Sequence, residues 1–262
     1  MTTDKPKPVP AIRNAAIILR YLAHSGEAEG VTAIARATGL SVSSTFTILR
    51  TLSGEELVSF DPETKTYRIG MGMIGLVSPL LAADPFDIVR PTVAEIADEL
   101  GVMIAIWQVA EDEHFILRYS VVSRLPLFVS MREGARVPAY VGAVGRCYAA
   151  TTGITEIAAR KKFAGIRWQN PPTFDDYWRD VLTCRETGFA FDYGNLFTGA
   201  NFAAALACDL GGRPRIGLSS ISLSGQFTQD RMADIARRLK RLAGRIEANV
   251  FGTTTPSDRR VS

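Results

Sequence analysis

The chain has 262 residues, of which 47% are hydrophobic and 22% charged, and its formal net charge is +3. This composition is typical of a folded, two-domain globular protein and excludes a largely disordered chain. The polar N-terminus MTTDKPKPVP and the lack of a long apolar run predict a cytoplasmic protein without a signal peptide or membrane span. The small net charge excludes a protein that coats nucleic acid but leaves room for a local DNA-reading surface.

Three short helices are predicted in the N-terminal segment. Residues Ala11–Ala23 carry apolar side chains at three- and four-residue spacing. A second helix ends at Gly39, since glycine tolerates positive φ, and Ser41 is placed to cap a third. We expect the inner face of that third helix to hold Val42, Phe46, Leu49 and Leu52.

The second and third helices, joined by a glycine-containing turn, predict a helix-turn-helix whose third helix enters the major groove. Its small hydroxyl groups suit base edges and phosphates. The candidate DNA contacts on this helix are Ser41, Ser43, Ser44, Thr45, Thr47 and Arg50.

A β-hairpin follows in LVSFDPETKTYRIG, with strands at 57–60 and 66–69, so the helix-turn-helix is predicted to be winged. Lys65 and Arg68 near its tip are candidates for phosphate contacts. Residues 1–82 carry eight Lys or Arg and seven Asp or Glu, a net charge of only +1. The spatial arrangement must therefore supply the positive face.

The rest of the chain predicts a connector followed by a mixed domain of antiparallel strands and helices in separate layers. Two helices, at 71–83 and 86–100, form the connector. The strands are expected at 103–110, 114–122, 202–208 and 215–223. The helices are expected at 144–151, 154–163, 175–187 and 229–250.

Gly70, Gly72 and Gly75 match the GxGxxG pattern of dinucleotide-binding loops. The surroundings disfavour that function, because the preceding strand is short and charged and Pro79 interrupts the following helix. We therefore expect no nucleotide cofactor at this loop.

The sequence contains no motif for metal binding or for thiol chemistry. His24 and His114 fall in different predicted domains without partners at ligand spacing, so no metal site is predicted. His114 also lacks the serine motif that a hydrolase would need. Cys147, Cys184 and Cys208 fit neither a CxxC pattern nor an evident disulfide framework, and we interpret them as buried thiols.

Six stretches together resemble the IclR family of bacterial transcriptional regulators, over nearly the whole chain. They are AAIILRYLA, TAIARATGLSVSSTFTILRTL, YRIG, GARVPAYVGAVGR, GFAFDYGNLFTGANFAA and ISLSG. The resemblance implies an α+β protein with a winged helix-turn-helix in 1–70 and dimerising linker helices in 71–100. It implies a GAF-like effector domain with an antiparallel sheet in 101–252 and a flexible tail at 253–262.

The resemblance also implies the partners and the effector contacts. The partners are operator DNA, a small-molecule effector and a second copy of the chain, with pairing of dimers into tetramers left open. No cofactor, metal or catalytic residue is implied. The effector contacts carried over are Ala143, Val144, Asp192, Ala200, Phe202, Ser222 and Ser224.

Two of these assignments also have a physical reason. A helix N-terminus beside Gly145 offers unpaired N–H groups to an organic acid. Ser222 and Ser224 fall two apart on a predicted strand, so they are expected to point into one cavity.

Several positions depart from the family pattern. Val42 and Thr47 replace basic residues that the family often has in the third helix, which removes two phosphate-binding charges. Tyr193, Gly194 and Asn195 replace an acidic pair. The aromatic residues near the expected pocket favour an aromatic or apolar ligand: Phe191, Tyr193, Phe197 and Phe202. Two other functions stay open, an enzyme using the C-terminal pocket and an interaction module with a degenerate helix-turn-helix.

Overall fold

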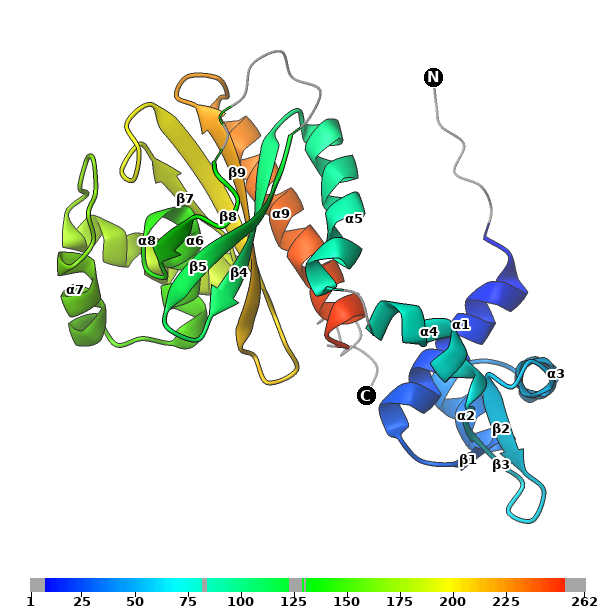
Figure 1. Ribbon diagram of the computed structural model, residues 1–262. Helices are drawn as coiled ribbons and strands as arrows, with labels where there is room; N and C mark the ends of the chain where they lie inside the picture. The colour runs from blue at the N-terminus through cyan, green and yellow to red at the C-terminus, as the bar shows by residue number, and fades with distance from the viewer. Residues whose placement is uncertain (1–7, 82–83, 123–128, 130, 253–262) are drawn as a thin grey trace. The chain divides into compact units, whose positions relative to one another are not determined.

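The chain folds as two units that meet between Asp84 and Pro85 in the sequence. The computed structural model describes residues 8–81, 84–122, 129 and 131–252 (Figure 1). The tail predicted at 253–262 lies outside the described residues. The fold class predicted from the sequence is confirmed: an N-terminal winged helix-turn-helix and a C-terminal domain built on an antiparallel sheet.

The N-terminal unit packs three helices against a small antiparallel sheet. The helices are α1 (Pro10–Ser25), α2 (Val31–Thr38) and α3 (Val42–Gly54). The strands, in the spatial order β1-β3-β2, are β1 (Glu29–Gly30), β2 (Val58–Asp61) and β3 (Thr66–Ile69). Their shared core contains Ile18, Leu22, Ile34, Leu49, Leu52, Val58 and Tyr67. Strand β1 was not predicted, because two residues carry no periodic signal.

Helix α4 (Gly72–Leu81) follows the wing, and two of the three glycines of the GxGxxG pattern, Gly70 and Gly72, lie where it begins. Gly70 and Gly72 donate backbone N–H bonds to the carbonyls of Leu57 and Glu56, at 2.9 and 3.0 Å. A Cβ on Gly70 would lie 2.2 Å from the Glu56 carbonyl oxygen. These glycines are therefore required where two backbone segments approach closely, which is a packing role.

The C-terminal unit is a six-stranded sheet in the order β6-β5-β4-β9-β8-β7, with antiparallel pairing throughout. The strands are β4 (Met103–Ala110), β5 (His114–Val121), β6 (Arg136–Pro138), β7 (Ala190–Tyr193), β8 (Ala200–Cys208) and β9 (Pro214–Leu223). The helices are α5 (Pro85–Leu100), α6 (Gly142–Thr152), α7 (Glu156–Ala164), α8 (Phe174–Thr187) and α9 (Gln229–Val250).

Helices cover both faces of this sheet (Figure 1). Helices α5 and α9 pack on one face, and their apolar residues share a core with Ala203, Ala205 and Ala207 of β8. Helices α6 and α8 pack on the other face, and their core includes Phe202 and Ala204 of the same strand. Because β8 is buried on both sides, residues 202–208 read as a continuous apolar run rather than as an alternating strand.

Helix α6 lies unusually close to its neighbours at two glycines. A Cβ on Gly145 would lie 2.2 Å from the carbonyl carbon of Tyr140, in the segment that leads into the helix. A Cβ on Gly217 of β9 would lie 2.8 Å from a methyl group of Val144. Gly145 therefore permits the tight entry into α6, and Gly217 permits the close approach of α6 to the sheet.

We expect Gly145→Ala to destabilise the C-terminal unit by about 3 kcal/mol or more, because backbone atoms of Tyr140 must move to admit the methyl group. Urea unfolding followed by tryptophan fluorescence measures this, since Trp107, Trp168 and Trp178 all lie in that unit. Gly165→Ala is the control, because its Cβ would meet only an ordinary contact at 3.6 Å. Equal midpoints for the two variants would contradict the prediction.

Candidate DNA-binding surface and effector pocket

Helix α3 begins at a capped N-terminus and exposes a row of hydroxyl groups. The Ser41 hydroxyl accepts the backbone N–H of Ser44 at 3.2 Å, which confirms the predicted cap. Ser43, Ser44 and Thr47 are exposed. The Thr47 hydroxyl donates to the Ser43 carbonyl at 3.0 Å, so its lone pairs remain directed to the outside. Because these side chains are short, they would let the helix approach a DNA groove closely.

The buried face of α3 differs from the predicted one. Thr45, expected among the DNA contacts, has 0% exposure and packs inward with Leu49 and Leu52. Its side chain does not reach the surface, so the expectation that Thr45 contacts DNA is wrong. Its hydroxyl has no hydrogen-bond partner within the part of the chain that the structure describes.

Val42 and Phe46, expected in the core, are 51% and 46% exposed. They lie four residues apart, and the guanidinium of Arg50, four further on, lies 6.0 Å from the Phe46 ring centre. The outer face of α3 therefore combines hydroxyls with two apolar side chains and one positive charge. Apolar side chains on such a face can contact thymine methyl groups.

The wing presents its basic residues beside a tight turn. The Asp61 carboxylate accepts the N–H groups of Glu63 and Thr64 at 2.9 and 3.4 Å, and these bonds hold its pKa below the usual value. Lys65 closes the turn at a φ of 56°, and Arg68 lies exposed on β3. The predicted positions of both basic residues on the wing are thus confirmed, while their contacts with phosphate stay a prediction.

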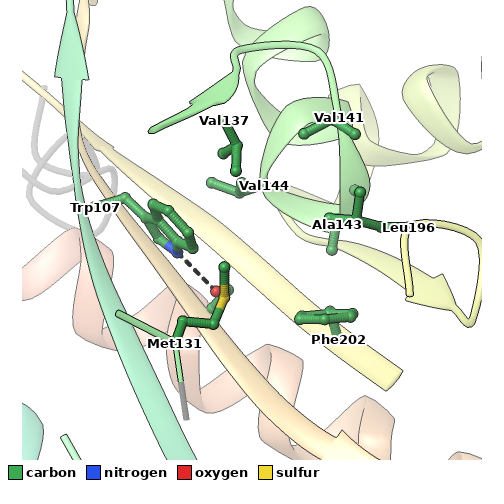
Figure 2. Close-up of a pocket in the computed structure, with 10 residues that line it drawn as sticks. Trp107, Met131, Val137, Val141, Ala143, Val144, Leu196 and Phe202 are labelled. Carbon is green, nitrogen blue, oxygen red and sulfur yellow. Dashed lines mark hydrogen bonds between the residues drawn. The ribbon is translucent and has the colours of Figure 1, made fainter. Parts of the chain in front are cut away.

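A small apolar cavity lies between α6 and the sheet in the C-terminal unit (Figure 2). Its volume is about 20 Å³, little more than one water molecule needs. The strands β4, β8 and β9, the first turn of α6 and the loop after β7 all contribute to its wall. The lining residues are Trp107, Met131, Val137, Val141, Gly142, Ala143, Val144, Leu196, Phe202 and Ser219.

Two polar features face this cavity. The Trp107 indole N–H donates to the Ser219 hydroxyl at 2.9 Å, the dashed line in Figure 2, and the Ser219 O–H remains as a donor. Helix α6 begins here with Val141 as an N-cap that provides no side-chain hydrogen bond. The N–H groups of its first turn have no helical carbonyl within reach, so they can bind an acceptor.

Arg146, one turn into α6, is fully buried and uses its three guanidinium nitrogens in three bonds of 3.0 Å. Its Nε donates to Asp180 of α8, Nη1 to Asp192 of β7 and Nη2 to the Asn195 side chain. Burial raises the pKa of Asp180, against the lowering effect of the guanidinium. Asp192 also accepts the N–H groups of Asn195 and Leu196, at 2.8 and 3.2 Å. The network thus holds Leu196 over the cavity.

Three of the seven predicted effector residues line the cavity: Ala143, Val144 and Phe202. Ala200 is buried in the same core but does not reach the opening. Asp192 lies behind the wall, with its carboxylate engaged by Arg146.

Contrary to expectation, Ser222 and Ser224 do not line this cavity. Ser222 points to the opposite face of the sheet, where its hydroxyl lies 3.8 Å from the Met232 sulfur on α9. Ser224 follows the end of β9 and bonds the Asn201 side chain at 3.1 Å, and neither serine lines the cavity. Ser219 is the serine that faces it.

The residues that sequence reasoning missed include Trp107, Leu196, Ser219 and Arg146. Trp107 lies at a β-bulge between β4 and β5, where the register shifts after Ile106. A bulge re-aims side chains, and this one carries the largest residue of the pocket wall. Only the tryptophan in an otherwise aliphatic strand gave a signal in the sequence.

The described residues contain neither a cluster of metal ligands nor a helix that could span a membrane. Across 8–81, 84–122, 129 and 131–252, no three His, Cys, Asp or Glu side chains are grouped to hold a metal ion. No helix in those ranges has the length and apolar character that crossing a membrane requires.

Two family profiles match the chain. The IclR helix-turn-helix domain matches residues 11–62. The C-terminal domain of the bacterial transcriptional regulator IclR matches residues 80–248, which is more than half of the chain. The chain belongs to the IclR family of bacterial transcriptional regulators. It is therefore a DNA-binding regulator and not an enzyme, as predicted.

Individual relatives of this IclR-family protein are distant. It is 22% identical to the HTH-type transcriptional repressor AllR of Escherichia coli K12, over 86% of this chain and 84% of AllR. The structure of the Agrobacterium tumefaciens repressor BlcR is similar, with a TM-score of 0.69, 19% identity and coverage of 94% of this chain and 99% of BlcR. The structure of Pseudomonas aeruginosa HmgR is also similar, with a TM-score of 0.62, 20% identity and coverage of 91% of this chain and 97% of HmgR. These structures share the fold.

We expect Arg146→Met to destabilise the regulator by about 3–5 kcal/mol, because it leaves the Asp192 carboxylate buried without its charge partner. Urea unfolding by tryptophan fluorescence measures the loss. Arg160→Met is the matched control: its ion pairs with Glu156 and Asp175 are exposed, so about 1 kcal/mol or less should be lost. A small loss for Arg146→Met would show that the network contributes little.

Proposed function

We propose that this protein is a homodimeric, cytoplasmic regulator that binds an operator with α3 of each subunit and responds to a small apolar effector. Residues 1–70 would read the DNA, 71–100 would link and pair the subunits, and 101–252 would bind the effector. The observation that carries the proposal is the outer face of α3, a capped helix with exposed hydroxyls, followed in the chain by a wing that exposes Lys65 and Arg68.

DNA recognition by this surface depends on short-range contacts more than on charge. Arg50 is the only charged residue in α3, so the helix itself neutralises little phosphate. Lys65 and Arg68 supply phosphate contacts from the wing, which orient the protein without reading sequence. The hydroxyls of Ser43, Ser44 and Thr47 would then contact base edges.

The exposed apolar surface at the start of α4 supports the proposal that two subunits pair. Met71, Ile74 and Leu76 are exposed, and residues 71–81 carry no charged side chain. Such a surface on a monomer would be costly in water, and an antiparallel copy of itself would cover it. Sedimentation of a monomer at micromolar concentration would contradict this pairing.

The effector is proposed to be a small molecule with an aromatic or apolar body and at least one acceptor oxygen. Ser219 provides the hydroxyl group of the lining, and the nearby carboxylate of Asp192 is engaged by Arg146. A carboxylate or carbonyl oxygen of the ligand would bind the N–H groups of the first turn of α6. Because the cavity is small, Leu196 must move outward for such a ligand to enter, and this movement is the proposed response.

Bound and free proteins would then differ in the loop after β7. A ligand shifts an equilibrium only by its difference in affinity for the two states. A ligand that requires Leu196 to move binds the open state alone, so it selects that state. The operator affinity of the dimer would follow the populations of the two states.

We expect Ser43, Ser44 and Arg50, changed together to alanine, to lower affinity for the most enriched genomic fragment by a factor of about 10 or more, since each base contact contributes about 1–3 kcal/mol. Lys65→Ala with Arg68→Ala should weaken binding to all DNA, and the slope of log affinity against log salt should fall by about one for each phosphate no longer neutralised. Fluorescence anisotropy at several salt concentrations measures both.

Thr45→Val is the control within the same helix. It replaces a buried, unpaired hydroxyl with a methyl group, so the operator affinity should stay unchanged and stability should rise by about 1 kcal/mol. Unchanged DNA binding by the triple variant, or loss of DNA binding by a folded Thr45→Val protein, would refute the proposed DNA-binding surface.

For the effector, a thermal-shift panel should show higher melting temperatures with aromatic monocarboxylates than with aliphatic keto acids of similar charge. Ser219→Ala should weaken the best ligand by a factor of about 5, because a hydrogen bond is lost. Ser222→Ala, on the opposite face of the sheet, should leave its affinity unchanged. Binding of keto acids alone, or a larger effect of Ser222→Ala, would refute the assigned pocket chemistry.

A further inference from the structure

Two buried thiols lie within reach of each other between α6 and α8. The sulfur atoms of Cys147 and Cys184 are 3.6 Å apart, and the two residues are only 2% and 4% exposed. The pair is separated by 37 positions in the chain, so nothing in its spacing predicted the contact. Cys208, the third cysteine, lies on β8 and is partly exposed.

The surroundings make the two thiols unequal. Burial raises the pKa of Cys147, whose sulfur also lies 3.3 Å from the Ala204 carbonyl. The neighbouring Cys147 thiol and the more distant Lys240 ammonium lower the pKa of Cys184 against the effect of its burial. Cys184 is therefore the better nucleophile of the two, since the thiolate is the reactive form.

We propose that Cys147 and Cys184 are a redox modification site, at which a small hydroperoxide joins them in a disulfide. A disulfide needs the sulfur atoms at about 2.0 Å. Starting from 3.6 Å, the two sulfurs must close by roughly 1.5 Å, which small rotations about both Cα–Cβ bonds can supply. This inference does not rest on the proposed operator or effector.

The chemistry proceeds in two displacements. The Cys184 thiolate attacks one oxygen of the hydroperoxide; the O–O bond breaks, and the alcohol, or water from hydrogen peroxide, leaves with the thiol proton. The Cys147 sulfur then attacks the sulfenic sulfur of Cys184, the S–O bond breaks, and water leaves with the second proton. The two thiols lose two electrons in total, and the hydroperoxide gains them.

A disulfide between Cys147 and Cys184 would also affect the cavity, because it would join α6 to α8. Cys147 follows Arg146 in α6, and Cys184 lies one turn beyond Asp180 in α8. The Arg146–Asp180 ion pair already joins these helices at 3.0 Å. A disulfide would add a covalent link beside it, and would thereby restrain the helix whose first turn forms the cavity wall.

The test uses the full chain treated with hydrogen peroxide, then unfolded in an alkylating agent, digested and analysed by mass spectrometry. We expect one cross-linked peptide pair containing Cys147 and Cys184, lighter by two hydrogen atoms and separated again by a thiol reductant. Cys208→Ser should give the same product. Cys147→Ala and Cys184→Ala should each abolish it, and circular dichroism checks that these variants are folded.

Alkylation of both Cys147 and Cys184 after a treatment that oxidises Cys208 would overturn the proposal. A sulfinic acid at Cys184 without any cross-link would overturn it equally, because it would show that Cys147 does not resolve the intermediate. Hydrogen exchange tests the effect on the pocket. The α6 amides should exchange more slowly in the oxidised protein, and unchanged exchange would contradict the proposed restraint.

Discussion

The C-terminal unit is organised around one buried positive charge. A fully buried guanidinium is stable only when partners neutralise its charge and accept hydrogen bonds from its nitrogens. Arg146 meets this requirement with two carboxylates and one amide, each at 3.0 Å, from α8, β7 and the loop after β7. Its position on α6 therefore determines where all three segments lie. The same contacts occupy Asp192, and they leave the cavity without a charged side chain in its lining.

The N-terminal unit must bind DNA, a polyanion, although its own net positive charge is very small. Its core uses the inner residues of α3, and the outer face keeps only short hydroxyls, two apolar side chains and Arg50. Weak long-range attraction lowers binding to arbitrary DNA as much as binding to the operator. In the proposed binding mode, discrimination then depends on how closely α3 approaches the bases, and its small side chains permit a close approach.

Periodicity in the sequence predicted the kinds of element well and their orientation poorly. All four predicted strands and the four long helices of the second unit are present, because their apolar runs are long. The face of α3 was wrong by one residue, since Val42–Phe46–Leu49 and Thr45–Leu49–Leu52 both fit a helical stripe. Packing against α1 and α2 selects the second.

In β9, burial on both faces removes the alternation of polar and apolar residues that would show which face each side chain takes. Every residue from Ile216 to Ser222 in β9 is buried, so the sequence gives no alternation from which to choose Ser219 over Ser222. Arg146 was not predicted for a related reason: an arginine is normally a surface residue. Its carboxylate partners lie 34 and 46 positions away in the chain. Only the folded chain brings them together.

Gly217 has an evolutionary consequence of its own. It lies in the middle of β9, beneath Val144, where an added methyl group would come within 2.8 Å of that side chain. It does not line the cavity, yet it sets the clearance between the roof and the floor. A homologue with a larger residue here must raise its α6 and would gain a taller chamber. If the cavity binds the proposed effector, the size of that effector can therefore diverge through a strand position that does not line the cavity.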